Sequence, residues 1–229
     1  MTLNHLVLVG GGHTNALLMK SWLMKPNLIP SVPITIISRD SFLVYSSMYP
    51  SVISRSISLK QSLINISSLA NSAKVSFVNS EVRDIQFDNQ QIILKNRPSI
   101  QYSKIILNCG SATKVSNKFS KLVKDDIACT IRPFLKSYQF IKSEDAFNTK
   151  NELPFVIIGS GLGAIEIAFA LRKRWKNRAL ILVCNPSKIS RRFLKSLEIF
   201  NIKIKEDINF AYKKVLLCTG NSPHSWIKN

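Results

Sequence analysis

The sequence contains one local pattern twice. An apolar run of strand length leads into a glycine-rich turn in HLVLVGGGHTNA at residues 5–16, and again in FVIIGSGLGA at residues 155–164. In both copies the residues that follow have a helical pattern. A strand, a glycine turn and a helix in this order predict a fold that binds the pyrophosphate of a dinucleotide. Two copies in one chain favour two nucleotide sites over two ordinary glycine turns.

Glycine suits such a turn because the backbone must approach the phosphates closely and adopt positive φ at the N-terminus of a helix. In the first copy Gly10 and Gly12 occupy the first two glycine positions, and Asn15 stands at the third. The third glycine normally allows close packing of the helix on the strand, and the alanine after Asn15 would take over that packing. The second copy has Gly159 and Gly161, with an alanine as an accepted small residue in third place.

Length and composition limit the class of protein. With 229 residues, 45% of them hydrophobic, the chain can form a sizeable core as one large domain or two small ones. No apolar stretch reaches the ~20 residues that span a bilayer. The N-terminus enters a strand pattern without a basic leader, so we expect a cytoplasmic protein and leave contact with the membrane surface open. The four cysteines and three histidines are scattered, which predicts neither a disulfide framework nor a metal site.

The formal net charge of +19 favours anionic partners such as nucleic acid, acidic lipid headgroups or a phosphorylated cofactor. Basic residues concentrate locally at 172–178, and no aromatic-interleaved pattern of a known nucleic-acid-binding module accompanies them. We interpret this cluster as a solvated helix end and expect no nucleic-acid partner.

Strands that alternate with helices predict parallel sheets. In the first part of the chain we expect a helix at 16–24 and a strand at 34–37. Residues 74–111 hold short alternating runs, which we interpret as a small antiparallel insert followed by a buried strand, and residues 112–126 read as a surface connection.

The second part of the chain repeats the scheme. A helix at 137–147 precedes the second turn, and the elements expected after it are a helix at 164–175, a strand at 180–183, a helix at 191–200, and strands at 202–204 and 214–217. The predicted fold class is therefore α/β, with two Rossmann-like units of which the second is inserted in the first.

Several segments together resemble the pyridine nucleotide-disulfide oxidoreductase superfamily, flavoproteins that bind two dinucleotides. The resemblance rests on residues 6–16, 34–50, 102–111, 157–168 and 217–223. Within the superfamily the sequence looks most like type II NADH dehydrogenases, sulfide:quinone oxidoreductases and the flavoprotein domain fused to selenide, water dikinase. The resemblance implies an FAD-binding domain at 1–135 and 206–229 and an NAD(P)-binding domain at 150–205. Hydride would pass from NADH or NADPH to FAD and on to a small-molecule electron acceptor, with quinone as one candidate.

The resemblance also assigns roles to single residues. The residues implied at the pyrophosphate, ribose and adenine of FAD, or close to it, are Gly10, Gly11, Gly12, His13, Ser38, Arg39, Val82 and Gly110. Those implied at the NAD(P) pyrophosphate are Gly159, Gly161 and Leu162. Thr219 and Gly220 match the strand-end signature where the second unit returns to the first. Glu166 matches a carboxylate near the nicotinamide and flavin and is the catalytic candidate, its alternative being a partly exposed helical glutamate.

The sequence departs from the family in ways that bear on function. Residues 46–50 lack the paired cysteines of the disulfide reductases, so we expect direct transfer from flavin to acceptor. After Val183 the acid that favours NAD is replaced by Cys184 and Asn185, while Lys188, Arg191 and Arg192 would neutralise a ribose 2′-phosphate, which keeps NADPH open. At the strand end after residue 37, Ser38 stands in place of the usual ribose-binding acid, and Asp40 is either a ribose ligand or part of a plain turn.

The sequence also lacks the Gly-Asp segment that holds the ribityl phosphate side of FAD in this family, and residues 205–213 leave little room for the family's small antiparallel sheet. We therefore expect an FAD domain without its C-terminal half, completed by a partner chain or a second copy. The alternative function is that of a truncated or decayed homologue, which acts as a nucleotide-binding or interaction module without catalysis.

Overall fold

The structure is a computed structural model that describes residues 4–149 and 152–227, and it forms two compact units. Within the described residues, unit 1 comprises 4–45, 63–111 and 223–227, and unit 2 comprises 46–62 and 112–222. These bounds differ from those of the predicted domains, because 46–62, 112–135 and 206–222 belong to the unit of the second glycine turn. Which unit holds FAD and which holds NAD(P) stays a prediction.

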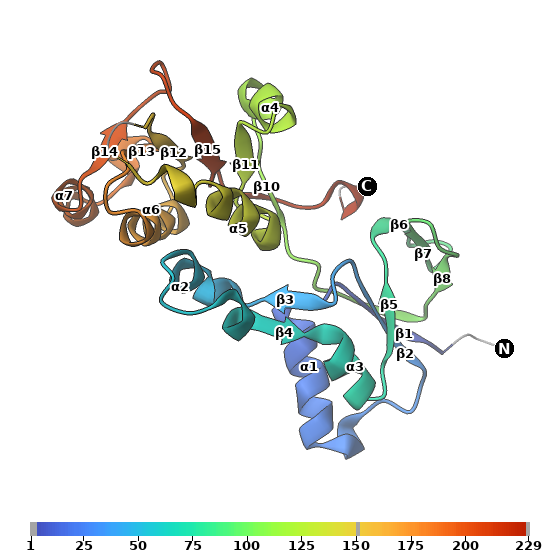
Figure 1. The fold of residues 1–229 in the computed structure, drawn as a ribbon. Helices are drawn as coiled ribbons and strands as arrows, with labels where there is room; N and C mark the ends of the chain where they lie inside the picture. The colour runs from blue at the N-terminus through green and yellow to red at the C-terminus, as the bar shows by residue number, and fades with distance from the viewer. Residues whose placement is uncertain (1–3, 150–151, 228–229) are drawn as a thin grey trace. The chain divides into compact units, whose positions relative to one another are not determined.

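Unit 1 is built on a four-stranded parallel sheet in the order β5-β2-β1-β9 (Figure 1). Its strands are β1 (Leu6–Val9), β2 (Ile34–Ser38), β5 (Ser76–Asn79) and β9 (Lys104–Leu107). Every residue of β1 and β2 is buried, which explains their nearly continuous apolar sequence, since both faces of a central parallel strand are covered.

Each face of this sheet has its own cover. Leu8 and Ile36 pack against helices α1 (His13–Met24) and α3 (Ile66–Ser72). On the other face, Val7 packs with Ile85 and Ile92 of an antiparallel sheet. That sheet consists of β6 (Val82–Gln86), β7 (Gln91–Leu94) and β8 (Ile100–Gln101). Successive side chains of β1 therefore point alternately to the helices on one face of the sheet and to the antiparallel insert on the other.

The predicted antiparallel insert is present at 82–101, but its first run was placed wrongly. Residues 76–79 form β5, which pairs in parallel with β2 so that Phe77 lies opposite Ile36. A short alternating run gives no sign of whether its partner is parallel or antiparallel. A separate antiparallel pair, β3 (Phe42–Val44) with β4 (Leu63–Asn65), completes unit 1.

Unit 2 is built on a five-stranded parallel sheet in the order β11-β15-β12-β13-β14. The strands are β11 (Ala128–Thr130), β12 (Phe155–Ile158), β13 (Leu180–Val183), β14 (Ile202–Lys205) and β15 (Lys214–Leu217). Four of them match predicted strands, and the three-residue β11 was missed because it is too short to show a period. The predicted α/β fold class is confirmed in both units.

Helices and short turns surround this second sheet. The helices are α2 (Tyr49–Ile53), α4 (Asn117–Lys124), α5 (Phe134–Ser143), α6 (Leu162–Arg174) and α7 (Arg191–Ile199). A two-residue pair, β10 (Ala112–Thr113) with β16 (Asn221–Ser222), lies beside them. The 3-10 turns in the described residues are η1 (Pro26–Leu28) and η6 (Ser225–Ile227) in unit 1, and η2 (Ser46–Met48), η3 (Leu59–Ser62), η4 (Asp145–Phe147) and η5 (Pro186–Lys188) in unit 2.

Two of the predicted segments in unit 2 need correction. Residues 112–126 are not a plain surface connection, because they contain α4, whose Phe119 is buried in the core of the sheet. The helix predicted at 137–147 is α5, which starts three residues earlier and is followed by η4. Among the described residues, no helix is long and apolar enough to cross a membrane.

Candidate functional site

The two glycine turns have the same backbone geometry. The N–H of Gly10 donates to the carbonyl of Ile37 at 2.8 Å, and the N–H of Gly159 donates to the carbonyl of Val183 at 3.0 Å. Each turn thus begins at the carboxyl end of one strand, β1 or β12, and is tied to the next strand along the chain, β2 or β13. The carboxyl ends of parallel strands are where open α/β sheets bind ligands, so each unit carries one candidate site.

The first glycine of each turn is required by packing within the protein. Gly10 has φ +93°, and a Cβ atom there would lie 2.4 Å from the carbonyl oxygen of Asn108. Gly159 has φ +154°, and a Cβ atom there would lie 2.3 Å from the carbonyl oxygen of Cys218. Gly161, in contrast, has open space around the position of a Cβ, so only a ligand would restrict it.

The candidate site of unit 1 is a pocket of about 230 Å³ at the carboxyl edge of its sheet. The FAD residues of the sequence analysis that line it are Gly10, Gly11, Gly12, Ser38, Arg39, Val82 and Gly110. The predicted residue His13 is not part of the lining, and its ring lies against that of Tyr45 with 5.1 Å between the centroids. The structure therefore gathers seven of the eight predicted residues.

Asn108 covers part of the N-terminus of α1 in this pocket. Its carbonyl accepts from the N–H of Gly12 at 3.1 Å, and its Oδ1 accepts from the N–H of Asn15 at 3.3 Å. Asn15 is completely buried and its Nδ2 donates to the carbonyl of Gly10 at 2.8 Å, while its Oδ1 has no partner among the described residues. The residue at the third glycine position therefore braces the turn as a buried amide.

The rim of the unit 1 pocket holds a short-range polar network. The hydroxyl of Ser38 donates to the carbonyl of Asp40 at 2.8 Å, and Arg39 forms an ion pair with the Asp40 carboxylate at 3.1 Å. His224 lies 3.2 Å from the carbonyl of Cys109 through Nε2, and it lines the pocket together with Trp226. Asp40 thus pairs with Arg39, the cation that the sequence analysis expects at the ribose.

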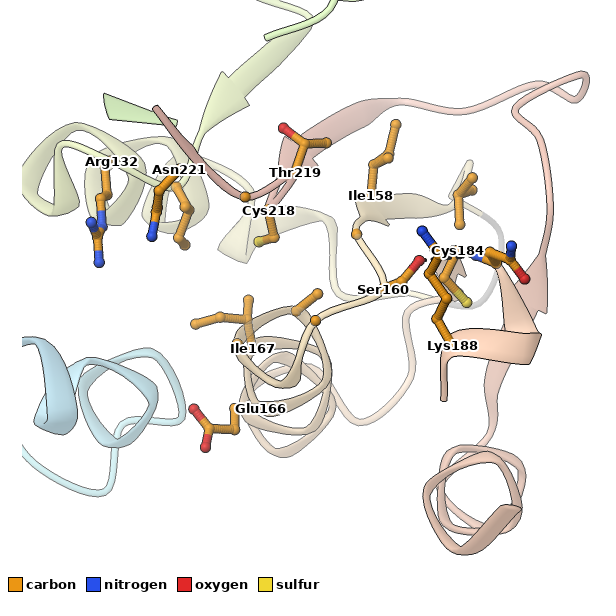
Figure 2. Close-up of a pocket in the computed structure, with 18 of the residues that line it drawn as sticks. Arg132, Ile158, Ser160, Glu166, Ile167, Cys184, Lys188, Cys218, Thr219 and Asn221 are labelled. Carbon is orange, nitrogen blue, oxygen red and sulfur yellow. Dashed lines mark hydrogen bonds between the residues drawn. The ribbon is translucent and has the colours of Figure 1, made fainter. Parts of the chain in front are cut away.

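The candidate site of unit 2 is larger, with a volume of about 720 Å³ (Figure 2). The predicted site residues that line it are Gly159, Gly161, Glu166, Thr219 and Gly220. Leu162 begins α6 but is not part of the lining. Thr219 and Gly220 were expected where the chain returns to the FAD domain, and the structure places them in the same pocket as the predicted NAD(P) residues.

The N-terminus of α6 opens into this pocket without a side-chain cap among the described residues. Gly161 and Gly163 both line the pocket, and neither would bring a Cβ atom against another group. The hydroxyl of Ser160 accepts from the N–H of Asn185 at 3.0 Å, which ties the turn to the end of β13. An uncapped helix N-terminus presents backbone N–H groups and a partial positive charge to an anion.

Charged side chains lie at both ends of the unit 2 pocket. Figure 2 shows Glu166 on α6 at one side and Lys188 at the other, beyond Ser160. Glu206 and Asp207, directly after β14, also line the pocket. The sequence analysis missed this acidic pair, although two acids immediately after a predicted parallel strand are a usable signal. Two of the three cations proposed for a 2′-phosphate, Arg191 and Arg192, are not part of the lining.

The cysteines of the chain are free and their thiols are protonated at neutral pH. Burial raises the pKa of Cys218, which lines the unit 2 pocket, to about 12. Burial also raises the pKa values of Cys109, Cys129 and Cys184. Within the described residues, no three histidine, cysteine, aspartate or glutamate side chains are placed to hold a metal ion.

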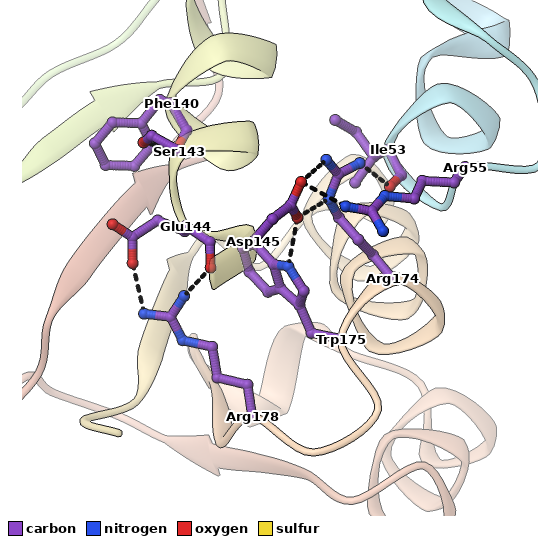
Figure 3. A network of polar contacts seen from close by, with 9 residues as sticks. All are labelled: Ile53, Arg55, Phe140, Ser143, Glu144, Asp145, Arg174, Trp175 and Arg178. Carbon is purple, nitrogen blue, oxygen red and sulfur yellow. Dashed lines mark hydrogen bonds and ion pairs between the residues drawn. The ribbon is translucent and has the colours of Figure 1, made fainter. Parts of the chain in front are cut away.

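Ion pairs hold α6 in place behind the pocket (Figure 3). The guanidinium of Arg174 donates twice to Asp145 at 2.6 Å, and Arg55 and the indole of Trp175 bond to the same carboxylate at 2.5 and 2.8 Å. Arg174 also donates to the carbonyl of Ile53 at 3.0 Å. This network ties residues 46–62, which supply part of the pocket wall, to the C-terminal end of α6.

A second ion pair lies beside the first and is fully buried. Arg178 donates to the Glu144 carboxylate at 2.7 Å and to the Glu144 carbonyl at 3.2 Å, and the exposed fractions of the two side chains are 0% and 4%. The guanidinium lies 5.4 Å from the ring centre of Phe155 and 5.0 Å from that of Trp175. Such contacts compensate in part for the removal of the charges from water.

No family model and no curated protein matches the sequence. Solved structures match the fold. One is reduced CoADR-RHD of Bacillus anthracis, with 16% identity, a TM-score of 0.80, and coverage of 100% of this chain and 46% of that one. Another is NDH2 from Plasmodium falciparum in complex with NADH, with 13% identity, a TM-score of 0.77, and coverage of 98% and 56%.

A third match is the sulfide:quinone oxidoreductase from the hyperthermophilic bacterium Aquifex aeolicus, with 16% identity, a TM-score of 0.69, and coverage of 93% and 58%. The chain thus spans about half the length of the structures that it matches. The identities are low, and what the likeness establishes is the fold. The chain has the α/β fold of these solved structures, with two Rossmann-like units of which the second is inserted in the first.

Proposed function

We propose that the chain is a flavin-dependent NAD(P)H oxidoreductase, in which unit 2 binds NADH or NADPH and unit 1 binds FAD. The observation that carries this proposal is the pocket of about 720 Å³ at the carboxyl edge of the unit 2 sheet. This volume falls within the roughly 300–1,000 Å³ of small-molecule and cofactor sites. The uncapped N-terminus of α6 opens into it, as a pyrophosphate would require.

The residues of unit 2 suit a dinucleotide. Gly161 and Gly163 leave the backbone accessible, because no side chain stands between the helix N-terminus and the pocket at these positions. The polar lining at Asn185 and Thr219 offers hydrogen-bond partners to ribose hydroxyls on either side of the turn. The pocket wall also includes Tyr49 and Phe134, whose rings lie 4.5 Å apart and provide an apolar surface for a nicotinamide or adenine ring.

The residues of unit 1 suit FAD in part. The glycine turn, Ser38 and Arg39 offer the donors that a pyrophosphate and a ribose need. The volume of about 230 Å³ lies below the usual range, so the pocket would hold only one end of such a cofactor. Asn108 already occupies the N–H groups of Gly12 and Asn15, which leaves fewer donors at the N-terminus of α1.

FAD, when bound, supplies the acceptor for a hydride from reduced nicotinamide. The side chains of this chain bind and orient the two nucleotides. Glu166 is the proposed catalytic residue, because its exposed carboxylate lies on the pocket wall and can accept a hydrogen bond from a nicotinamide carboxamide. The raised pKa of Cys218 keeps this thiol protonated, so it does not form a thiolate relay at neutral pH.

The acceptor that takes electrons from the flavin is proposed to be a small molecule, with quinone as one candidate. The name of the Aquifex aeolicus structure includes a quinone, which supports this choice by analogy of fold. A complementing chain or a second copy of this chain would extend the small pocket of unit 1. Peripheral contact with a membrane fits a quinone acceptor and the net charge of +19.

The proposal is tested with purified full-length chain. FAD titration should give a bound yellow chromophore, and anaerobic NADH or NADPH should bleach it. E166Q should bind the nucleotide within about threefold of wild type and slow the bleaching at least tenfold, since a lost positioning interaction acts on the reaction more than on binding. E198Q, an exposed glutamate on α7 that does not line the pocket, is the matched control and should behave as wild type. A protein that binds neither FAD nor NAD(P)H contradicts the proposal.

A second function is favoured by the small size of the unit 1 pocket and by the position of Asn108. The chain would then act as a nucleotide-binding or interaction module without catalysis. Calorimetry distinguishes the two, because the module binds NADH or NADPH and releases no heat with FAD. Bleaching of bound flavin by NAD(P)H excludes it.

A further inference from the structure

We propose that the unit 2 pocket selects NADH over NADPH, and that Glu206 is the residue that sets this preference. The inference rests on the proposed function, since it names which of the two nucleotides the same pocket takes. In folds of this type an acid about 20 residues after the glycine turn binds the 2′-hydroxyl of the adenosine ribose. Here that carboxylate is supplied from the neighbouring strand.

The usual position holds no acid. The residues that follow β13 are Cys184 and Asn185. Cys184 is only 6% exposed. The Oδ1 of Asn185 already accepts from the N–H of Ser187 at 3.0 Å and from its hydroxyl at 2.6 Å. Neither residue therefore offers a free acceptor of the strength of a carboxylate to a ribose.

Glu206 lies directly beside this position. Strands β13 and β14 run in parallel with Val183 opposite Lys205, and the N–H of Cys184 donates to the carbonyl of Lys205 at 2.9 Å. Glu206 is the next residue, one strand away at the usual spacing of ~4.8 Å. It is exposed, lines the pocket, and makes no hydrogen bond or ion pair within the described chain. Its charge also contributes to the raised pKa of Cys184, after the effect of burial.

The other charged side chains at this end of the pocket also disfavour a 2′-phosphate. Asp207 follows Glu206 and lines the pocket, and its Oδ1 accepts from the N–H of Asn209 at 3.1 Å. Among the described residues that line the pocket, Lys188 is the one cation that comes from the β13 side. Among the lining residues at this end, two carboxylates against one ammonium group leave a net charge of −1, which favours a hydroxyl and disfavours a phosphate.

The remaining cations of the pocket do not change this balance. Lys118 and Arg132 belong to α4 and to the residues after β11, and the sheet order places β11 at the edge opposite to β14. Arg192, which the sequence suggested as a phosphate ligand, instead lines a groove with Phe169 and Phe200 between α6 and α7. Arg191 lines neither surface.

The test is calorimetry of the full chain with NADH and with NADPH at low salt. Wild type should bind NADH at least tenfold more tightly than NADPH. E206Q removes one charge and weakens the carboxylate acceptor, so the ratio of the two dissociation constants should fall by about tenfold. E206K should reverse the preference. E198Q removes the same charge from the exposed face of α7 and should leave the ratio unchanged.

The outcomes separate this inference from the function on which it rests. Equal binding of both nucleotides by wild type overturns the assignment of Glu206 and leaves NAD(P)H binding intact. A preference for NADH that survives unchanged in E206Q and E206K also overturns it. Absence of heat with either nucleotide overturns the proposed function and this inference together. A preference that falls in E206Q, reverses in E206K and persists in E198Q supports the assignment.

Discussion

Gly159 lies so close to the carbonyl oxygen of Cys218 that a Cβ atom on the glycine would be 2.3 Å from that oxygen. Gly10 and Asn108 have the same relationship in unit 1, at 2.4 Å. Both contacts join the glycine turn of a unit to the end of the strand beside it. The duplicated glycine is therefore explained by the protein's own packing before any ligand is considered.

Gly159→Ala should destabilise the chain. The Cβ atom would collide with backbone that cannot rotate away, at a φ of +154° that side chains rarely adopt. We expect a loss of at least ~2 kcal/mol in the free energy of unfolding, or misfolding, measured by urea denaturation.

Gly161→Ala is the matched variant, because its Cβ atom would meet nothing within 4 Å. It should keep the stability of wild type within about 0.5 kcal/mol and weaken NAD(P)H binding at least tenfold, since the methyl group would stand between the turn and a pyrophosphate. Unchanged NAD(P)H binding by this variant would argue against the unit 2 pocket as the nucleotide site.

Arg178→Met should destabilise the chain by about 3–5 kcal/mol, because it leaves the carboxylate of Glu144 buried without its partner. The combined variant with Glu144→Leu should recover much of this loss, since no buried charge remains. Urea denaturation of the two single variants and the double variant measures the coupling. The exposed pair of Lys95 and Glu81 is the control, and Glu81→Gln should change stability by less than about 1 kcal/mol.

The stability contribution of Asp145 should depend on pH. Burial alone would raise the pKa of this carboxyl, but its hydrogen bonds to Arg174, Trp175 and Arg55 outweigh that effect and lower the pKa below 3.8. A lowered pKa in the folded state means that the contribution is complete above the unfolded pKa and is lost as the pH falls through the folded pKa.

Asp145→Asn should therefore be less stable than wild type at pH 7. This gap in the free energy of unfolding between the two proteins should narrow as the pH falls below about 4. Thermal unfolding between pH 3 and pH 7 measures this gap. The exposed Asp88→Asn should show no such dependence. A gap that is constant over this range would contradict the ionised, multiply bonded Asp145.

The thiol of Cys218 should react slowly with iodoacetamide in the folded chain. Burial raises its pKa to about 12, so less than about one thiol in a thousand is ionised at pH 8, and the thiolate is the reactive form. Mass spectrometry of the alkylated peptides should show rapid labelling only after denaturation. Fast labelling of Cys218 in native protein would contradict its raised pKa.

The sequence alone determined the α/β class and the positions of the two glycine turns. It could do so because these features are local: an apolar run, a turn that needs glycine and a helix signal are adjacent in the chain. The strands at 34–37 and 180–183 were predicted for the same reason, since buried central strands are nearly continuously apolar.

The tertiary structure decided what depends on residues far apart in the sequence. It placed 76–79 in the parallel sheet and buried Phe119 of a segment whose lysines suggest a surface. It also showed that Thr219 lines the unit 2 pocket and that Glu206 follows the residue paired with Val183, beside Cys184. Strand pairing and burial depend on residues that are tens of positions away in the sequence. The local pattern that predicts a strand therefore does not predict which strand lies beside it, or which charged side chains meet at its end.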